Sequence, residues 1–465
     1  MDSKTLSEMI SFGRLSGKAY WAADGLLRFA ADDALARSWS PENLLADENQ
    51  PAAQEITPGR LRALTLRMTG AGRVKVTGAF VGVATAAQPL RIFTRDGQPL
   101  RLRPIGDVSW FGLFEQLGGS FWSAATNLFT WSQDISQADW IALGATVAAA
   151  SQAAPDGATM QKLVESAVAE THRIHQNVAF TGGVTYTVSR YVAAGERDQI
   201  DIMLAASAFG ADVAWRFDLT AVTASQVTAG TNDVGSIEAT PIAGVYRIRL
   251  TADATATAFA EVRFRLWSAG VLDYAGDGVS GLYLWGGQCE AGDYPSPYIP
   301  TAGAAAARAA DVTSLPLSAF DFNPVEGTLV VTGRLDVQST AYRVLVCVND
   351  GTAAFQNRYL EIYAKGATLV AESWSNGAPL AIFSLPFVAG RPFSVALRVK
   401  AGDFAACIDG GAVLTGANPG PVTATNITTL SVGRRGPSWP LDGFISRLVY
   451  IPFGVSNEML QALTA

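Results

Sequence analysis

The chain has 465 residues, of which 16% are charged and 45 are glycine, and its formal net charge is −7. This length suffices for about three domains, and the plentiful glycine, valine, threonine and aromatic residues favour sheets and tight turns over helical bundles. The negative charge argues against a nucleic-acid partner, because nucleic-acid binders carry basic faces that neutralise phosphates. We therefore expect an all-β, multidomain protein.

Neither membrane insertion nor export by a signal peptide is expected. The most apolar stretch, residues 76–87, is interrupted by Gly78 and Gly82 and is shorter than the ~18 residues that a spanning helix needs. The first residues lack the basic region and apolar region of a cleavable secretory signal.

Residues 1–118 are expected to form an N-terminal region that contains a small β-domain. Asp24-Gly25 lies between two short apolar runs, which predicts a hairpin. From about residue 60 to residue 110, short alternating segments recur between turns such as Asp96-Gly97. This pattern predicts a small antiparallel β-domain.

Residues 119–303 carry a longer series of alternating segments, with the spacing of a sandwich or jelly roll. The expected strands are residues 185–192, 199–204, 214–219, 245–251, 260–267 and 281–287. Residues 159–171 differ, because they have helical propensity and an i, i+3, i+4 pattern. An alanine-rich linker, residues 304–313, follows.

Residues 314–465 alternate again and predict a second β-sandwich. The expected strands are residues 328–337, 343–349, 359–364, 368–374, 393–400, 404–409 and 444–451. A short helix over residues 456–463 is expected to close the chain, with Ser456 as its N-cap.

Several motifs between residues 127 and 312 resemble a carbohydrate-binding-module-like jelly roll found in tailed-phage structural proteins. They include NLFTWSQD at residues 127–134, GDGVSGLYLWGGQ at residues 276–288 and RAADV at residues 308–312. The resemblance implies that residues 162–165 form a strand, and we adopt this in place of the helix.

Residues 12–37 resemble the segment that precedes this jelly roll in phage head and tail appendage proteins. Because that segment leads almost directly into the jelly roll there, residues from about 49 to 118 look like an insertion. The C-terminal part is similar to concanavalin A-like (laminin-G-like) lectin sandwiches, through EGTL at 326–329, LSVG at 430–433 and LDGFISRL at 441–448.

Together these resemblances imply a virion appendage, a head spike or tail fibre, of a tailed phage or a phage-derived gene transfer agent. Such a protein is expected on the virion surface after assembly in the bacterial cytoplasm. Its expected partners are other virion structural proteins and further copies of itself, with the N-terminal region holding it on the particle.

Groups that titrate near neutrality are scarce, since the chain has only His172 and His175. This argues against acid–base or triad catalysis, and we expect no enzyme. His175 is expected to have a polar surface role. Residues 276–281 match a dinucleotide fingerprint by letter, but a strand and not a helix is expected after them.

The carboxylates and cysteines suggest no catalytic or metal chemistry by themselves. A depolymerase would need two carboxylates across a cleft, and sequence cannot place the candidates Asp336, Asp350, Glu361 and Glu372. No cofactor is expected. Binding of a structural calcium ion by such carboxylates is the alternative to a solvated role. The spacing of Cys289, Cys347 and Cys407 predicts buried thiols without disulfides or a zinc site.

Candidate carbohydrate-binding residues come from both sandwiches. In the jelly roll, alternation places one set outward, on a face that would also hold Arg173 and Arg216: Arg247, Arg249, Arg263, Arg265 and Trp267. Arginine forks and an indole ring suit an acidic or hydroxyl-rich glycan, although an ordinary solvated or subunit-contacting face is the alternative. The second set lies in loops of the lectin-like domain: Trp374, Asn376, Arg434, Arg435 and Trp439. Tryptophans that cap the core are the alternative there.

The leading hypothesis is a non-enzymatic virion protein that binds capsular or other surface polysaccharide of its host. The first alternative is a structural decoration or fibre subunit whose sandwiches only pack against sister subunits. The second is a polysaccharide-degrading spike.

Overall fold

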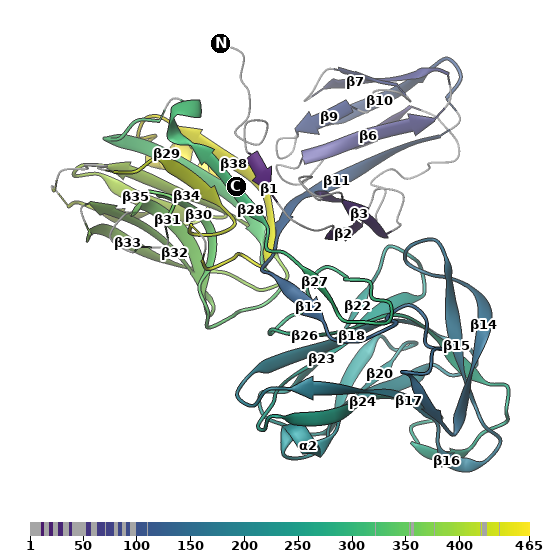
Figure 1. Ribbon diagram of the computed structural model, residues 1–465. Coiled ribbons are helices and arrows are strands. Elements are labelled where there is room, and N and C mark those ends of the chain that lie inside the picture. The colour runs from purple at the N-terminus through teal and green to yellow at the C-terminus, as the bar shows by residue number, and fades with distance from the viewer. Residues whose placement is uncertain are drawn as a thin grey trace. The chain divides into compact units, whose positions relative to one another are not determined.

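The computed structural model describes residues 11–13, 18–21, 27–30, 37–39, 53–56, 63–69, 71–78, 82–85, 90–93, 99–108, 110–320, 322–352, 354, 358–375, 377–418, 420, 426–436 and 438–465. Nearly all of their regular structure is strand, and the helical segments are short: α2 (Ala206–Phe209), the 3-10 turn η1 (Leu317–Ala319) and α3 (Asn457–Thr464) (Figure 1). The expected all-β class is confirmed. The chain forms two compact units, one of residues 1–15, 32–123 and 310–465, the other of residues 16–31 and 124–309.

The second unit is a sandwich of two six-stranded antiparallel sheets. The first has the order β13 (Ile141–Leu143), β17 (Arg173–Phe180), β24 (Ala258–Trp267), β19 (Gln199–Leu204), β20 (Val213–Asp218) and β21 (Thr223–Thr228). The second has the order β14 (Ala145–Ala153), β15 (Thr159–Glu165), β26 (Gly281–Ala291), β18 (Thr185–Ala193), β23 (Val245–Asp253) and β22 (Val234–Ala239). The strand adopted for residues 162–165 is thus confirmed, and the helical pattern there was misleading. A strand also follows residues 276–281, as expected.

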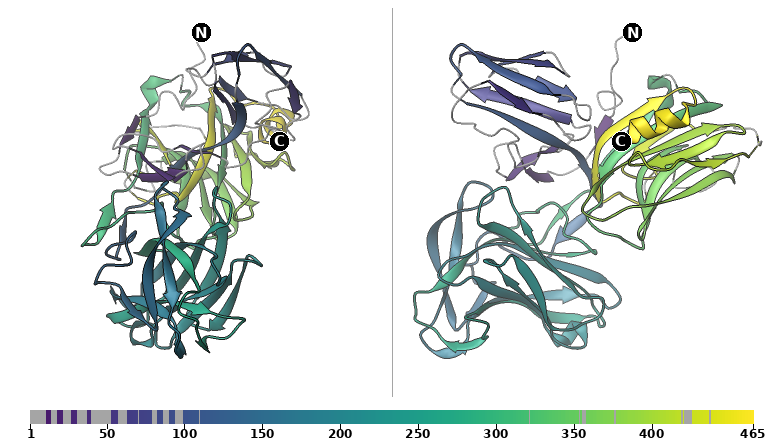
Figure 2. Two further views of the ribbon diagram at one scale, coloured as in Figure 1. Left: turned by 90° about the vertical axis from the view of Figure 1, so that its right-hand side faces the viewer. Right: turned by 180° about the vertical axis from the view of Figure 1, so that it is seen from behind.

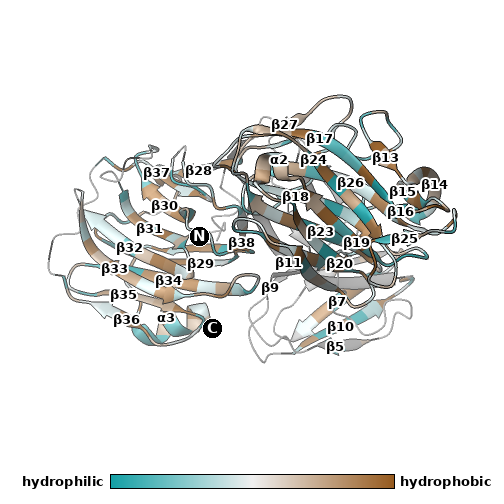
Figure 3. Ribbon diagram, turned by 90° about the horizontal axis from the view of Figure 1, so that it is seen from below, coloured by the Kyte–Doolittle hydropathy of each residue, from teal (hydrophilic) through white to brown (hydrophobic). Residues whose placement is uncertain are grey.

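Period-2 alternation builds the core between these two sheets. Ile248 and Leu250 of β23 face Val262 and Phe264 of β24 within one buried cluster, and Figure 3 shows the alternating hydropathy along such strands. Cys289 is a free thiol in this core.

The second unit contains a buried arginine without a hydrogen-bonded partner in the part of the chain that the structure describes. The Arg190 side chain of β18 is fully buried, and its guanidinium carbon is 4.3 Å from the ring centroid of Trp140 and 4.2 Å from that of Phe264. Its three side-chain nitrogens have no hydrogen-bond partner among the described residues. Burial lowers the pKa of Arg190 to about 9, so cation–π contact is the main compensation for its charge.

The C-terminal sandwich in the other unit also has two antiparallel sheets. One has the order β1 (Ser11–Gly13), β28 (Val312–Pro316), β37 (Thr429–Val432), β30 (Arg343–Asn349), β31 (Arg358–Lys365), β32 (Thr368–Ser375) and β33 (Ala378–Pro386). The other has the order β36 (Leu414–Gly416), β35 (Phe404–Ile408), β34 (Pro392–Lys400), β29 (Glu326–Arg334), β38 (Gly443–Ile451), β11 (Trp110–Phe121), β6 (Ala63–Thr69) and β9 (Leu90–Phe93), with β4 (Arg37–Trp39) also paired to β11. Their core contains Leu329, Leu345, Ile362 and Leu397.

Strands from the N-terminal region join both of these sheets. β11 pairs with β6 over residues 110–115 and with β38 over residues 119–121, and β1 pairs with β28. A separate small sheet has the order β5 (Gln54–Ile56), β10 (Leu100–Ile105), β7 (Arg73–Gly78) and β8 (Gly82–Ala84). The domain boundaries drawn from the sequence stay predictions.

Short strand pairs complete the fold. β2 (Lys18–Trp21) and β3 (Leu27–Ala30) form the expected hairpin, whose turn Asp24-Gly25 lies outside the described residues. β12 (Ala125–Asn127) pairs with β27 (Ala306–Arg308), so part of the segment expected to be a linker is a strand. β16 (Ala169–Thr171) pairs with β25 (Asp273–Ala275).

Helix α3 begins where expected, since the Ser456 side chain accepts a hydrogen bond from the Met459 amide. Figure 2 shows the helix lying on the sheet of β34 and β35, where Leu460 joins a small cluster with Val330, Ala396 and Cys407. Cys347 and Cys407 are buried free thiols, as expected. None of the helices in the described part of the chain has the length and apolar character needed to cross a bilayer.

Candidate functional site

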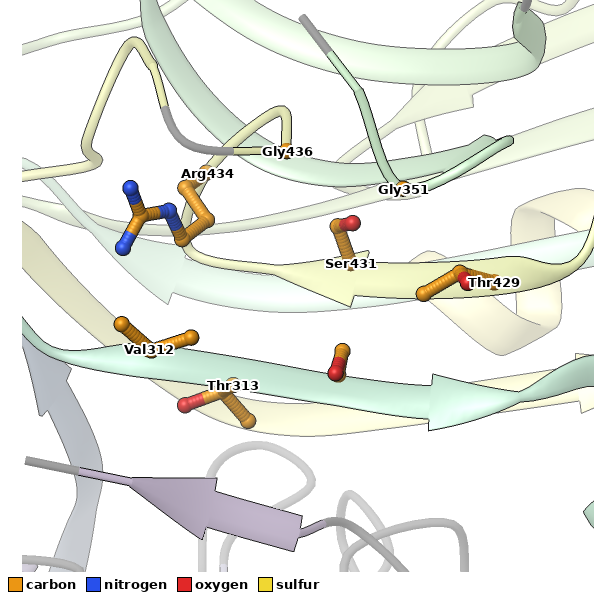
Figure 4. A pocket seen from close by; sticks show the side chains of 8 residues that line it. Val312, Thr313, Gly351, Thr429, Ser431, Arg434 and Gly436 are labelled. Carbon is orange, nitrogen blue, oxygen red and sulfur yellow. The ribbon is translucent and has the colours of Figure 1, made fainter.

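A pocket lies on the outer face of the β28–β37 sheet, away from the core. Ser314 and Ser431 are directly opposite across β28 and β37, and because neighbouring Leu315 and Leu430 enter the core, alternation turns both serines outward. Two loop segments, at Gly351 and at residues 434–436, border the same space. The pocket has a volume of about 410 Å³ and is lined by Val312, Thr313, Ser314, Gly351, Thr429, Ser431, Arg434 and Gly436 (Figure 4).

Arg434 is the charged residue among those lining side chains. It is 8% exposed, and its Nη1 donates a hydrogen bond to the Asp311 carbonyl oxygen at 3.1 Å. Its Nε has no hydrogen-bond partner among the described residues. Burial lowers the pKa of Arg434, which reflects the cost of holding this charge where little water reaches it.

Arg435, the next residue, has a different role in the structure. Its side chain is fully buried, and its Nε donates to Glu361 Oε1 at 2.6 Å, while Nη2 contacts Oε2 of the same carboxylate. Its guanidinium carbon lies 4.3 Å from the ring centroid of Trp439. Arg435 and Trp439, both named from the sequence, are therefore neighbours that pack on each other, with Arg435 buried and Trp439 partly exposed.

Trp374 belongs to a second cluster of an arginine, a glutamate and a tryptophan, on strands β31 and β32. The guanidinium carbon of Arg358 is 3.7 Å from the Trp374 ring centroid, and Arg358 Nη2 is 2.8 Å from Glu372 Oε1. The sequence analysis did not identify Arg358. The isolated charges of Glu361 and Glu372 within apolar strands were a signal that a buried basic partner lies nearby. Asn376 lies outside the described residues.

Glu361 and Glu372, two of the depolymerase candidates, are cross-strand neighbours on β31 and β32. Both are buried, and burial raises the pKa of Glu372 to about 7 against the opposing effect of Arg358. Neither carboxylate faces an open cleft in the described part of the chain. Asp336 lies 2.8 Å from Arg334 Nε in an ion pair. Among the described residues, no three His, Cys, Asp or Glu side chains gather as metal ligands would.

The expectation that the jelly-roll arginines share one face is wrong. β23, with Arg247 and Arg249, belongs to the sheet of β18 and β22, whereas β24, with Arg263 and Arg265, belongs to the other sheet. All four point away from the core, so the two pairs occupy opposite outer faces of the sandwich. Alternation along a strand determines which side chains point toward the core and which point outward, but it does not determine to which sheet the strand belongs.

Arg247 and Arg249 are held by neighbours on their own face. Arg247 donates to Ser189 Oγ at 2.9 Å, and Arg249 lies with its guanidinium carbon 4.1 Å from the Tyr294 ring centroid. Arg249 Nε is also 3.7 Å from Glu238 Oε1. Both arginine side chains therefore already contact neighbouring side chains on this face.

The opposite face contains an ordered charge network. Arg265 Nη2 is 2.6 Å from Asp201 Oδ2, and the Trp267 indole donates to that same oxygen at 3.0 Å. Arg263 Nε is 2.6 Å from Glu261 Oε2. His175 is 3% exposed, so the expected surface role is wrong, and burial lowers its pKa. Trp267 is also buried.

Comparison with models of known protein families finds no match. A search of well-characterised proteins likewise finds no match. Among solved structures, the chain is similar to the Ruminococcus gnavus sialidase module CBM40 bound to α2,3-sialyllactose, with 20% identity over 31% of this chain and 84% of that one, at a TM-score of 0.27. It is also similar to sheep galectin-11 (15% identity, 30% of this chain and 96% of that one, TM-score 0.22) and to domains LG4-5 of the mouse laminin α1 chain (9% identity, 72% and 92%, TM-score 0.22).

Proposed function

We propose that the protein is a non-enzymatic virion appendage that binds surface polysaccharide of its host through the pocket of β28 and β37. The observation that carries this proposal is the nearly buried Arg434 lining a pocket together with Ser314, Thr313 and Thr429, with its Nε unpartnered among the described residues. A guanidinium fork and clustered hydroxyls are groups that recognise the hydroxyl and carboxylate oxygens of sugars.

The pocket size is consistent with such a ligand. A volume of about 410 Å³ lies at the lower end of the range of ~300–1,000 Å³ for small-ligand sites, which suits one or two sugar residues rather than a long chain segment. Single sites would bind weakly, and several copies on one particle would raise the avidity. The virion setting rests on the motifs in residues 127–312 and on the N-terminal segment 12–37.

Arg435, Trp439 and Trp374 have a supporting role in this proposal. Because Arg435 is held by Glu361 and stacked on Trp439, it anchors the loop from which Arg434 reaches the pocket. Trp374 stacks on Arg358 on the neighbouring strands. These residues position the site and are not proposed as sugar contacts.

A glycan array probed with the full chain tests the proposal. We expect binding to a defined set of bacterial polysaccharides, and Arg434→Ala should reduce it about tenfold, as expected for the loss of a charge-assisted hydrogen bond. Arg391→Ala is the matched control, because Arg391 is an exposed arginine outside the pocket. An array without binding, or equal loss in both variants, would leave the structural decoration role as the better account.

A further inference from the structure

On the outer face of the sheet that contains β17 and β24, Arg173 has no carboxylate within ion-pair distance among the described residues. Arg173 of β17 is partly exposed and forms no ion pair within the described part of the chain. Its neighbours on β24 are Arg265, directly opposite, and Arg263, which lies two residues further along and opposite His175. Those two are committed to Asp201 and Glu261 respectively. Arg173 is therefore the arginine of this row that is free to bind an anion.

The surroundings of Arg173 indicate where the anion would lie. Burial and the nearby positive charges of Arg263 and Arg265 lower the pKa of Arg173, and the charge of Glu261 opposes them only in part. Across the sheet, Leu143 of β13 lies opposite Arg173, and Ile141 lies opposite His175. These two aliphatic side chains are 44% and 43% exposed and form an apolar shelf beside the arginine.

We propose that Arg173, with Leu143 and Ile141 beside it, forms a second binding site, which takes a carboxylate-bearing sugar of an acidic polysaccharide. The guanidinium would hold the carboxylate through two hydrogen bonds, and the apolar face of the sugar ring would lie on the aliphatic shelf. This inference rests on the proposed glycan-binding function, but it adds a different site and names the chemical class of its ligand.

An acidic sugar fits these features better than a nucleic acid does. The exposed ring of Phe259 lies opposite Ala179, six residues along β17 from Arg173. Trp267 is buried, and the guanidinium carbon of Arg216 is 4.9 Å from its ring, so neither ring offers a base a stacking surface beside Arg173. The three acidic residues nearby, Asp201, Glu261 and Asp218, would repel a phosphate backbone with one charge per nucleotide. A glycan with one carboxylate per repeat needs only one such arginine, Arg173.

The test measures binding of the full chain to labelled hexasaccharides of hyaluronan, galacturonan and oligosialic acid, with a neutral dextran oligosaccharide and a single-stranded DNA 20-mer for comparison. We expect at least one carboxylated probe to bind, more weakly in 300 mM than in 50 mM NaCl. Arg173→Gln should weaken that binding about tenfold or more. The affinity of Arg173→Lys should lie between those of Arg173→Gln and the wild type. Arg391→Gln should bind with the same affinity as the wild type. Unchanged thermal unfolding of the Arg173 variants shows that they fold.

Three results would overturn the inference: no binding of any carboxylated probe, Arg173→Gln behaving like Arg391→Gln, or tighter binding of the DNA. The proposed function is tested separately, because Arg434→Ala should leave Arg173-dependent binding intact. Glycan binding that depends on Arg434 and not on Arg173 would refute this inference alone. Absence of any glycan binding by the wild-type chain would refute both this inference and the proposed function.

Discussion

The guanidinium of Arg435 is paired with the carboxylate of Glu361, and both side chains are fully buried on the face of the sheet that points away from the core. This contact ties the loop segment of residues 433–436 to strand β31. Because Arg434 precedes Arg435 in that loop, the buried ion pair fixes the backbone from which Arg434 reaches the pocket.

We predict that Glu361→Gln destabilises the protein by about 3 kcal/mol, because it leaves the charge of Arg435 buried without its counter-ion. Chemical unfolding of the full chain, followed by tryptophan fluorescence, measures the loss. The double variant Glu361→Leu with Arg435→Met should recover most of it. Glu55→Gln, at an exposed ion pair with Arg101, is the control and should cost less than about 1 kcal/mol. A small loss in Glu361→Gln would mean that water reaches the pair.

Glu372 should make the folded state less stable as the pH rises. Its folded pKa of about 7 lies above its ordinary value of 4.5, so the folded protein holds this proton more tightly than the unfolded chain does. This group's contribution to the free energy of unfolding is therefore greatest below about pH 4.5 and decreases up to about pH 7, by on the order of 3 kcal/mol. Unfolding at pH 5, 6, 7 and 8 should show a steeper decline for the wild type than for Glu372→Gln. Parallel curves would show that Glu372 is ionised normally.

Gly287 makes room for the buried Arg190. A Cβ at residue 287 would lie 2.3 Å from Arg190 Nη2, and the guanidinium cannot move aside because the rings of Trp140 and Phe264 flank it. We expect Gly287→Ala to cost about 1–3 kcal/mol, as overpacking does. Gly303→Ala is the control, since its Cβ would meet only the Trp131 ring at 3.4 Å. Equal melting temperatures of the two variants would contradict the close packing around Arg190.

Much of the fold was predictable from the sequence, because alternation, turn residues and the N-cap are local signals. The C-terminal helix and its Ser456 cap are examples. Residues 159–165 show the limit of such signals, since their helical pattern gives way to pairing with β14 and β26 on either side. Pairing with neighbouring strands determined the conformation of that segment. The family resemblance predicted the strand, whereas the residue pattern did not.

The candidate sites were predictable only in part. Sequence identified Arg434 but could not distinguish it from Arg435, although one lines the pocket and the other is buried in an ion pair. That difference depends on how one loop folds over the sheet. Likewise, sequence showed that Arg249 and Arg263 point outward, but their assignment to opposite faces depends on long-range strand order.

Hydrogen–deuterium exchange of the full chain, with and without the glycan that the array selects, tests the central claim most directly. Backbone amides of residues 429–436 and 312–314, the segments that contribute most of the pocket's lining residues, should exchange more slowly when the glycan is bound, and Arg434→Ala should abolish this protection. Protection confined to other parts of the chain, or protection that persists in Arg434→Ala, would contradict the assignment of the pocket as the glycan-binding site.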